Sequence, residues 1–382
     1  MRAGIRLLVA SPLLIALQNH VQASPRDLPL ASRLQRGINL TGWFVGSSPT
    51  PAEKRFSDSD LRVISGLGFT FVRLPVNPAR LMLGRALNQD SLGALVRAID
   101  LITTSGLAVI VDFHPDQDFE RNVVSDKDSL HAFLGLLDAV CSHLRTRSTT
   151  DLGVELLNEP FDPGVGGKGW DWNVIQRELW KVARQALPEH TLVLTGDAWS
   201  SISGLSTVIP VPDPNVLYTI HFYQPYPFTH QGANWMASDP QHFADLRGVP
   251  YPGDSLRVST ALGPIIEHAS RAELRDSIRG ELLAYGRAHW NRDKLAHSFS
   301  QAAGWASQNR KQLVLGEFGV YKRGADPADR CRWVRDVREL AEANHFSWAM
   351  WEYDGGFGLL NEDHTANKCL TGALGLTPVE SR

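Results

Sequence analysis

Residues 152–160 read LGVELLNEP, a short apolar run that ends in two polar residues and a proline. The run lacks the strict alternation of a half-exposed strand, which favours a parallel strand covered on both faces. Pro160 cannot donate a hydrogen bond to a neighbouring strand, so it helps to end this one. Asn158 and Glu159 are therefore expected where a parallel strand finishes.

Seven further runs of this kind occur along the chain, and amphipathic helical patterns lie between them. The eight expected strands are 36–40, 69–74, 107–113, 152–157, 191–195, 216–221, 312–316 and 346–350. The clearest expected helices are 57–67, 91–105, 129–145, 171–186 and 329–343. Eight strands, each followed by a helix or a loop, match an α/β fold of the (β/α)8 TIM barrel type.

The main alternative fold is a doubly wound parallel sheet. That fold usually carries a glycine-rich phosphate loop after an early strand, and GINLTG at residues 37–42 is not such a loop. The chain shows no internal repeat, low-complexity segment or linker. A single barrel domain is the simplest interpretation.

One connection, from Tyr223 to Gln312 after the sixth strand, is unusually long. It begins with YQPYPFTHQGANWMASDP at 223–240 and reads as helical from about Arg271. Long connections in compact domains tend to be functional, so this excursion is expected to shape the mouth of the barrel. A surface insertion without a role is the alternative.

The first 23 residues have the composition of a secretory signal peptide. Arg2 and Arg6 precede a mostly apolar run at 7–17, and a small-x-small end follows at 21–23. The run is shorter than the roughly 20 residues of a membrane-spanning helix, although an uncleaved anchor is the alternative. We expect residues 24–382 to form the barrel domain, periplasmic or secreted, without membrane contact after cleavage.

Charge and cysteine content argue against two kinds of binding site. The formal net charge is −3 and no basic cluster occurs, so nucleic acid is not an expected partner. The three cysteines match no zinc motif. Cys141 is expected to be a buried thiol, and pairing of Cys331 with Cys369 is left open. No cofactor, metal or protein partner is implied.

Polar or aromatic residues follow each of these apolar strands. In a barrel the active site lies at the C-terminal ends of the strands, so these residues are expected to meet at one mouth. They are Asn39, Arg73, His114, Asn158 with Glu159, the run 196–199, His221 with Tyr223, Glu317, and Trp351 with Glu352. Any one of them is compatible with an ordinary strand end, but the set favours an active site.

Two carboxylates dominate this set, Glu159 after the fourth strand and Glu317 after the seventh. These strands lie on opposite sides of a barrel mouth, and paired carboxylates across a cleft are what cleavage of a glycosidic bond needs. The acid needs a raised pKa and its partner must stay ionised. Arg73 and Tyr223 are candidates to hold one carboxylate ionised, and His221 to lie near the other.

Two other strand-end residues suit a sugar. Asn158 offers an amide to a hydroxyl, and Trp351 offers a ring for stacking. The letters LLNE recur at 359–362, but there they follow a glycine-rich run beyond the eighth strand. Glu362 is therefore expected in a solvated loop.

Two short motifs carry a resemblance to a known family. NEP at 158–160 ends one expected strand and GEFG at 316–319 ends a later one, with Arg73, His114, His221, Tyr223 and Trp351 around them. This set resembles glycoside hydrolase family 5, the cellulase-type branch of the clan A barrels, over residues 36–351. The resemblance implies a (β/α)8 barrel and a retaining double-displacement mechanism without a cofactor.

The resemblance also implies a role for each site residue. Glu159 matches the acid/base and Glu317 the nucleophile. Arg73 and Tyr223 match groups that position the nucleophile, and His221 the histidine near the acid/base. The subsite before the cleaved bond is matched by His114, Asn158 and Trp351. Many members carry two histidines after the third strand, whereas 113–116 read FHPD, which puts the second histidine contact in doubt.

Alternative functions stay open at this point. A metal-dependent barrel hydrolase would use His114, Asp116 and His221, and a noncatalytic carbohydrate-binding barrel would keep the tryptophans without the chemistry. Among glycosidases, an endo-β-1,4-glucanase acting on an oligo- or polysaccharide is the first choice. A β-1,3-glucanase, a β-mannanase and a glycosidase that trims an exported polysaccharide are the other candidates.

Overall fold

The computed structural model describes residues 30–45, 55–84, 86–161, 171–235 and 240–377. The expected signal peptide, residues 1–23, lies outside the described residues. Within them, no helix combines the length and apolar character that a membrane crossing requires.

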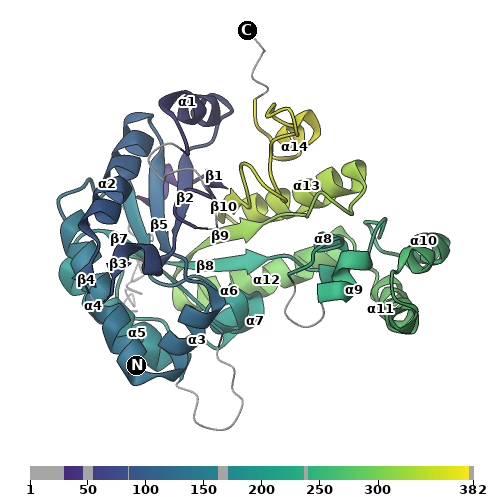
Figure 1. The fold of residues 1–382 in the computed structure, drawn as a ribbon, viewed down its shortest axis with the longest axis horizontal. Coiled ribbons are helices and arrows are strands. Elements are labelled where there is room, and N and C mark those ends of the chain that lie inside the picture. Colours follow the sequence, from purple (N-terminus) through teal and green to yellow (C-terminus); the bar gives the residue numbers. More distant parts are fainter. Residues whose placement is uncertain (1–29, 46–54, 85, 162–170, 236–239, 378–382) are drawn as a thin grey trace, which may run out of the picture.

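Eight parallel strands close into a barrel, as predicted from the sequence (Figure 1). Their order around the barrel is β1, β10, β9, β8, β7, β6, β5, β2 and back to β1. They are β1 Arg36–Asn39, β2 Phe71–Val76, β5 Ala108–Phe113, β6 Leu152–Glu155, β7 Thr191–Thr195, β8 Val216–Phe222, β9 Gln312–Phe318 and β10 Ser347–Met350. A closed barrel excludes the doubly wound sheet. A small antiparallel hairpin, β3 Met82–Leu83 and β4 Ala86–Leu87, follows β2.

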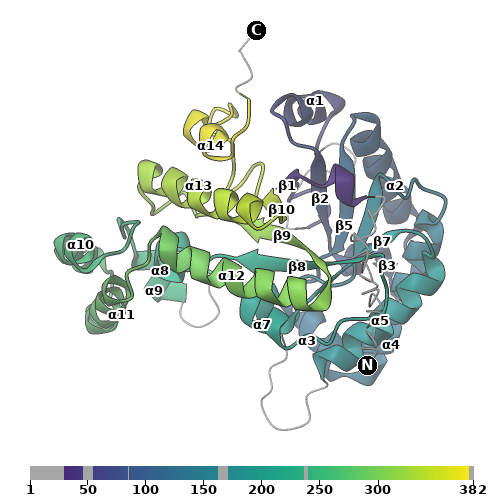
Figure 2. The same ribbon diagram turned by 180° about the vertical axis from the view of Figure 1, so that it is seen from behind.

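Helices surround the barrel on its outer face (Figures 1 and 2). The five expected from the sequence are confirmed as α1 Asp58–Gly66, α2 Gln89–Thr104, α4 Lys127–Leu144, α5 Trp172–Ala186 and α13 Pro327–Ala343. The structure adds α3 Gln117–Ser125, α6 Asp197–Ser200, α7 Ile202–Ser206 and α14 Lys368–Ala373, with short 3-10 turns at Ala31–Arg33, Pro78–Leu81 and Ala272–Leu274. A further helix, α12 Arg292–Asn309, lies in the part of the long connection that was expected to be helical. Side-chain caps start many of these helices. Ser57, for example, forms a capping box with Asp60.

The interior of the barrel is apolar at one end and polar at the other. Phe71, Ile110, Val193 and Leu217 belong to a separate buried apolar cluster. A Cβ atom on Gly37 would lie 2.3 Å from the Phe71 ring, so only glycine leaves room for that ring. Towards the C-terminal ends of the strands, beyond this apolar cluster, the barrel interior carries charged side chains. The candidate functional site begins there.

The long excursion between β8 and β9 is more helical than the sequence predicts. It contains α8 Tyr226–Thr229, α9 Pro240–Asp245, α10 Ser255–His268 and α11 Arg275–Arg287. The prediction that helix begins near Arg271 is wrong, because α10 already starts at Ser255 behind an Asp254 cap. The sequence does not predict α10 because the helix contains Pro264, and proline is normally unfavourable in the interior of a helix.

The outer part of the excursion packs on α13. Tyr251 donates its N–H to Asp329 at 2.9 Å and its hydroxyl to Asp336 at 2.8 Å. Arg257 adds an ion pair to Asp329 at 2.9 Å. The α10 and α11 pair consequently lies at the periphery, away from the barrel strands (Figures 1 and 2).

A disulfide joins α13 to α14. Cys331 and Cys369 are bonded, which resolves the pairing that the sequence left open, and Cys141 is a buried free thiol as expected. The bond closes a loop with a sequence separation of 38. Loop-closure entropy for that length corresponds to about 4 kcal/mol of stability.

Replacing both Cys331 and Cys369 with serine is expected to lower the free energy of unfolding by about 3–4 kcal/mol, because the unfolded chain regains the freedom that the cross-link removes. Urea unfolding with and without dithiothreitol measures this. The reductant should destabilise the parent and leave the double variant unchanged. If the urea midpoint of the parent protein is the same with and without dithiothreitol, the expectation is contradicted.

Candidate functional site

The polar end of the barrel is organised around Arg73, which is fully buried on β2. Its guanidinium makes a two-pronged contact with Glu155, with both N···O distances 2.8 Å. It also lies 2.9 Å from Asp112 Oδ2 and donates to Glu317 Oε1 at 2.7 Å and Asn158 Oδ1 at 2.8 Å. Burial lowers the pKa of Arg73, but the three carboxylates outweigh it and raise that pKa well above its usual value. Arg73 therefore stays charged.

Glu317, on β9, is held by two donors. Arg73 contacts one oxygen, and the Tyr223 hydroxyl donates to the other at 2.9 Å. A shift in the pairing of β8 with β9 between Ile220 and His221 sets His221 opposite Glu317. Burial raises the pKa of Glu317, while His221 and Arg73 act to lower it. The strands thus deliver a buried carboxylate that faces the barrel mouth with both oxygens engaged.

Glu159 follows β6 and has a different environment. Its backbone adopts φ 40°, a left-handed conformation that is unusual for a residue with a side chain. Its Oε1 lies 2.8 Å from His221 Nδ1. Burial raises the pKa of Glu159 to about 7, opposed by His114 and Arg73 and assisted by Glu155. Burial also lowers the pKa of His221 to about 4, so this imidazole is neutral near pH 7.

The two glutamates lie close enough for their charges to interact. One atom each from Glu159, Glu317 and His221 lies within 4.8 Å of the others. Two carboxylates at this range resist ionising together. Glu317 receives the Arg73 charge and the Tyr223 hydrogen bond, whereas Glu159 contacts a neutral imidazole. The arrangement favours an ionised Glu317 and a protonated Glu159.

The other three predicted site residues form one wall beside this pair. His114 Nδ1 contacts Asp112 at 2.8 Å, and its Nε2 lies 3.5 Å from the amide nitrogen of Asn158. The rings of His114 and Trp351 stack with centroids 5.6 Å apart and planes 12° apart. His114 therefore lies against one face of the Trp351 ring. All eight predicted site residues thus belong to one connected cluster.

Sequence reasoning missed several members of this cluster. Asp112 and Glu155, both fully buried inside strands, complete the Arg73 network. The sequence did hold a signal for them, because each is the one charged residue in an otherwise apolar run, LAVIVDF or LGVELL. A charged residue that is buried in a strand needs a partner of opposite charge or a hydrogen bond. Phe161 was also missed, and its ring stacks on Trp199 of the expected run 196–199, with centroids 4.0 Å and planes 16° apart and both side chains partly exposed.

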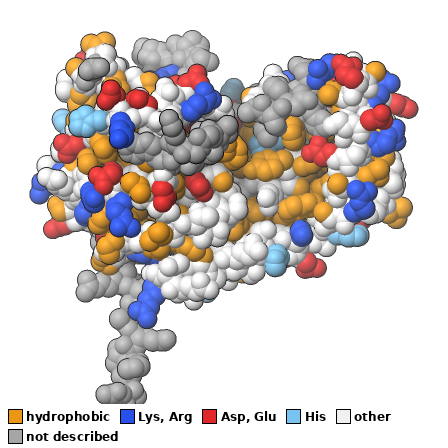
Figure 3. Space-filling model, turned by 90° about the horizontal axis from the view of Figure 1, so that it is seen from below, with side chains coloured by type: hydrophobic (Ala, Val, Ile, Leu, Met, Phe, Trp, Pro, Cys, Tyr) orange, Lys and Arg blue, Asp and Glu red, His pale blue; other side chains and the backbone are white. Residues whose placement is uncertain are grey.

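The excursion contributes aromatic side chains to the same end of the barrel. Burial, and to a smaller extent the charge of Glu159, raises the pKa of Tyr226 in α8. Trp235 contacts Tyr321 and Phe357, which follow β9 and β10. Figure 3 shows hydrophobic side chains along a hollow next to the excursion, on the face seen from below. The first part of the excursion therefore helps to form the mouth.

A metal site is a poor fit for this arrangement. Among the described residues, Glu159, His221 and Glu317 are grouped closely enough to contact one ion. The Arg73 guanidinium, 2.7 Å from Glu317, already supplies positive charge there. Asp116, which the metal-hydrolase alternative requires, caps α3 through the N–H of Phe119 at 2.9 Å.

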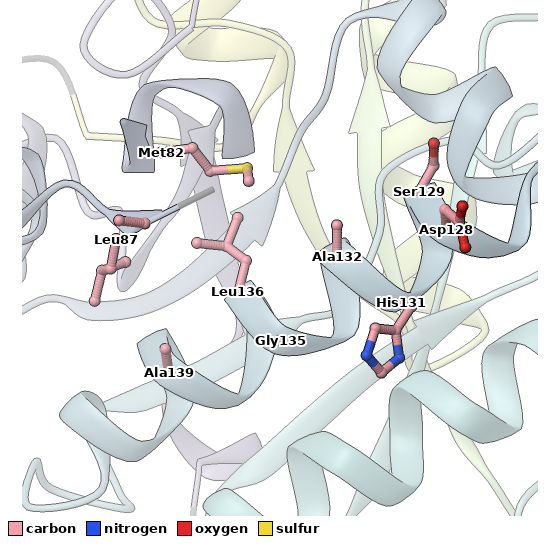
Figure 4. A pocket seen from close by; sticks show the side chains of 10 residues that line it. Met82, Leu87, Asp128, Ser129, His131, Ala132, Gly135, Leu136 and Ala139 are labelled. Carbon is pink, nitrogen blue, oxygen red and sulfur yellow. The ribbon is translucent and has the colours of Figure 1, made fainter. Parts of the chain in front are cut away.

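A hollow on the flank of the barrel is separate from this cluster. It lies between the β3–β4 hairpin and α4, where Met82 and Leu87 face Leu136 (Figure 4). None of the eight predicted site residues lines it.

Comparison with known proteins finds a family and several relatives. The family model for cellulase, glycosyl hydrolase family 5, matches residues 37–356. Endoglucanase C of Acetivibrio thermocellus is 25% identical over 340 residues, which cover 86% of this chain and 93% of that protein. Endoglucanase 3 of Fibrobacter succinogenes is 24% identical over 342 residues, covering 86% of this chain. The chain spans only 50% of the Fibrobacter protein.

Solved structures share the fold. A hyperthermophilic endo-beta-1,4-glucanase in complex with substrate superposes with a TM-score of 0.70 at 24% identity, covering 90% of this chain and 98% of that one. The family match extends over most of the chain and includes both glutamates and their partners. The chain therefore belongs to the cellulase family, glycosyl hydrolase family 5, and is a glycoside hydrolase.

Proposed function

We propose that this protein is an exported, retaining endo-β-1,4-glucanase that works by double displacement. The observation that carries the proposal is the pair Glu159 and Glu317, whose oxygens come within 4.8 Å across the barrel mouth and whose partners differ. Retaining glycosidases hold their carboxyl groups about 5–5.5 Å apart, whereas inverting enzymes leave roughly 6.5–9.5 Å for a water. The short separation supports retention.

In the first step, Glu317 attacks the anomeric carbon while Glu159 gives its proton to the departing glycosidic oxygen. The products are a free chain end and a glycosyl ester on Glu317. In the second step, Glu159, now ionised, removes a proton from water, and the water oxygen displaces Glu317. Tyr223 and Arg73 hold the attacking carboxylate in place throughout.

Aromatic side chains near the carboxylates support cleavage within a chain. The stacked rings of His114 and Trp351 belong to the cluster around the pair. The partly exposed Phe161 lies on the turn that carries Glu159, and its ring stacks on Trp199 of the segment after β7. Two separate aromatic surfaces, one at Trp351 and one at Phe161 and Trp199, suit a sugar chain that continues past the scissile bond. The names of the endoglucanase relatives point to β-glucan as the substrate.

A panel of soluble β-1,4-glucan, β-1,3-glucan and β-mannan, with product lengths resolved over time, tests substrate and mode of action together. We expect β-1,4-glucan to be cleaved fastest, with intermediate-length products early. Faster cleavage of mannan or β-1,3-glucan would reject the linkage, and release of only short units from chain ends would reject endo action. Carbohydrate binding without cleavage would identify a noncatalytic barrel.

Export is proposed from the N-terminal pattern in residues 1–23. Mass spectrometry of the protein recovered from the culture medium or periplasm of producing cells should give a mature N-terminus near Ser24. A chain that retains residues 1–23 in the membrane fraction would support the anchor instead.

The rate should depend on pH through the two glutamates. Because burial raises the pKa of Glu159 to about 7, its protonated form persists to neutral pH, and kcat/KM should fall as pH rises through about 7. Protonation of Glu317 should produce the acid limb. The measurement is kcat/KM on a soluble glucan from pH 4 to 9. A rate that still rises at pH 8 would show that Glu159 does not supply the proton.

A further inference from the structure

A buried carboxyl group outside the catalytic pair contacts the turn that carries Glu159. Glu120 lies in the first turn of α3 and is only 8% exposed. Its Oε1 accepts the backbone N–H of Phe161 at 2.8 Å. Glutamates are seldom buried without a specific partner, because desolvation of the carboxyl group is costly. The mechanism above gives this residue no role.

The turn from Glu159 to Phe161 needs support from its surroundings. A left-handed φ costs a residue with a Cβ atom roughly 1–2 kcal/mol, and Glu159 adopts φ 40°. Pro160 has no N–H, so Phe161 offers the first backbone donor after Glu159. That donor bonds to Glu120. The carbonyl of Pro160 accepts the N–H of Trp199 at 3.2 Å.

The turn is therefore tied on two sides, to α3 through Glu120 and to the segment after β7 through Trp199. The stacked rings of Phe161 and Trp199 form a second contact between the turn and the segment after β7. Burial and then the charge of Glu159 raise the pKa of Glu120 to about 8.

We propose that Glu120 is a positioning residue for the acid/base Glu159, and that it acts by accepting the Phe161 N–H. The inference rests on the proposed function, since it needs Glu159 to be the proton donor. Glu120 does not touch the substrate in this account. It keeps the carboxyl group of Glu159 at the distance and depth that proton transfer to the glycosidic oxygen requires.

Two substitutions separate the hydrogen bond from the charge. Glu120→Met keeps the approximate side-chain length and removes the carboxyl acceptor, whereas Glu120→Gln keeps an acceptor oxygen and is always neutral. Asp118→Ala, at an exposed position in the first turn of the same helix, is the matched control. Glu120→Ala replaces the methionine variant if that variant does not fold, as judged by urea unfolding.

The full-length variants are assayed for kcat/KM on soluble glucan and on a dinitrophenyl cellobioside, whose leaving group needs no proton. Glu120→Met should lose about 10- to 100-fold on glucan, a part of the 10²–10⁴ that general acid catalysis supplies. It should lose less than about 3-fold on the aryl substrate. The basic limb of the pH profile of kcat/KM for Glu120→Met should move to lower pH. A Glu159 side chain that is held less firmly is more exposed to water, so its pKa falls towards the ordinary value.

Glu120→Gln should recover most of the glucan activity, and Asp118→Ala should match the parent. Equal losses of Glu120→Met on both substrates, an unmoved basic limb, or a Gln variant as impaired as the Met variant would each overturn the inference. Glu159→Ala is run in parallel. If that variant also loses equally on both substrates, the proposed function has failed; if it spares the aryl substrate and Glu120→Met does not, only the role of Glu120 has.

Discussion

Replacing Glu317 with alanine is expected to lower kcat on soluble glucan by roughly 10⁴- to 10⁶-fold, about 5–8 kcal/mol of activation free energy. The change removes the attacking carboxylate that Arg73 and Tyr223 hold, so no glycosyl ester can form. The loss should be nearly as large on aryl cellobiosides, because a good leaving group does not replace a nucleophile. Initial rates on both substrates measure it.

Added azide gives this variant a diagnostic product. Azide that enters the space left by the Glu317 carboxylate attacks the anomeric carbon once, so an aryl β-cellobioside should give an α-glycosyl azide. A Glu317→Ala enzyme that keeps more than about 1% of the parent rate would contradict the assignment. Glu362→Ala is the matched control, since Glu362 belongs to the second LLNE stretch and lies exposed after β10.

Replacing Glu159 with alanine is expected to show the opposite substrate dependence. On soluble glucan kcat/KM should fall by about 10²- to 10⁴-fold, the usual contribution of a general acid. On dinitrophenyl cellobioside kcat/KM should fall far less, because the departing phenolate needs no proton. Hydrolysis of the glycosyl ester then becomes slow because no general base activates the water. The ester on Glu317 should therefore accumulate after an initial burst of dinitrophenolate release.

Azide should raise the steady-state rate of the Glu159 variant, since it attacks the ester without needing base catalysis. The product should be a β-glycosyl azide, the anomer opposite to that from the Glu317 variant. NMR of the two azides therefore tests both roles at once. Equal losses on every substrate with no response to azide would mean that the roles are misassigned.

The strands could be predicted from sequence because parallel barrel strands are short apolar runs bounded by polar residues. All eight runs, including LGVELL and TLVLT, lie where the barrel strands do. The strand ends then identified the site, since residues that follow parallel strands meet at one mouth. That rule brought Arg73, Glu159 and Glu317 together without any knowledge of distances.

Contacts across the barrel could not be predicted in this way. Glu155 pairs with Arg73 from a strand 82 residues away, and nothing in LGVELL shows which charged residue it meets. The hydrogen bond between Glu120 and Phe161 depends on how α3 packs against the turn after β6, which the sequence pattern does not show. The start of α10 was missed because Pro264 interrupts its pattern, although packing on α13 stabilises that part of the excursion.

Identification of the covalent intermediate is the strongest test of the double-displacement mechanism. The parent enzyme is incubated with a 2-deoxy-2-fluoro cellobioside that carries a good leaving group, digested with a protease, and mapped by mass spectrometry. The fluorine slows both steps, but the leaving group lets the ester form and persist. We predict a fluorocellobiosyl group on the peptide that contains Glu317, at that residue. A label on Glu159, or turnover of the reagent with no covalent adduct at any time, would contradict the double-displacement mechanism proposed here.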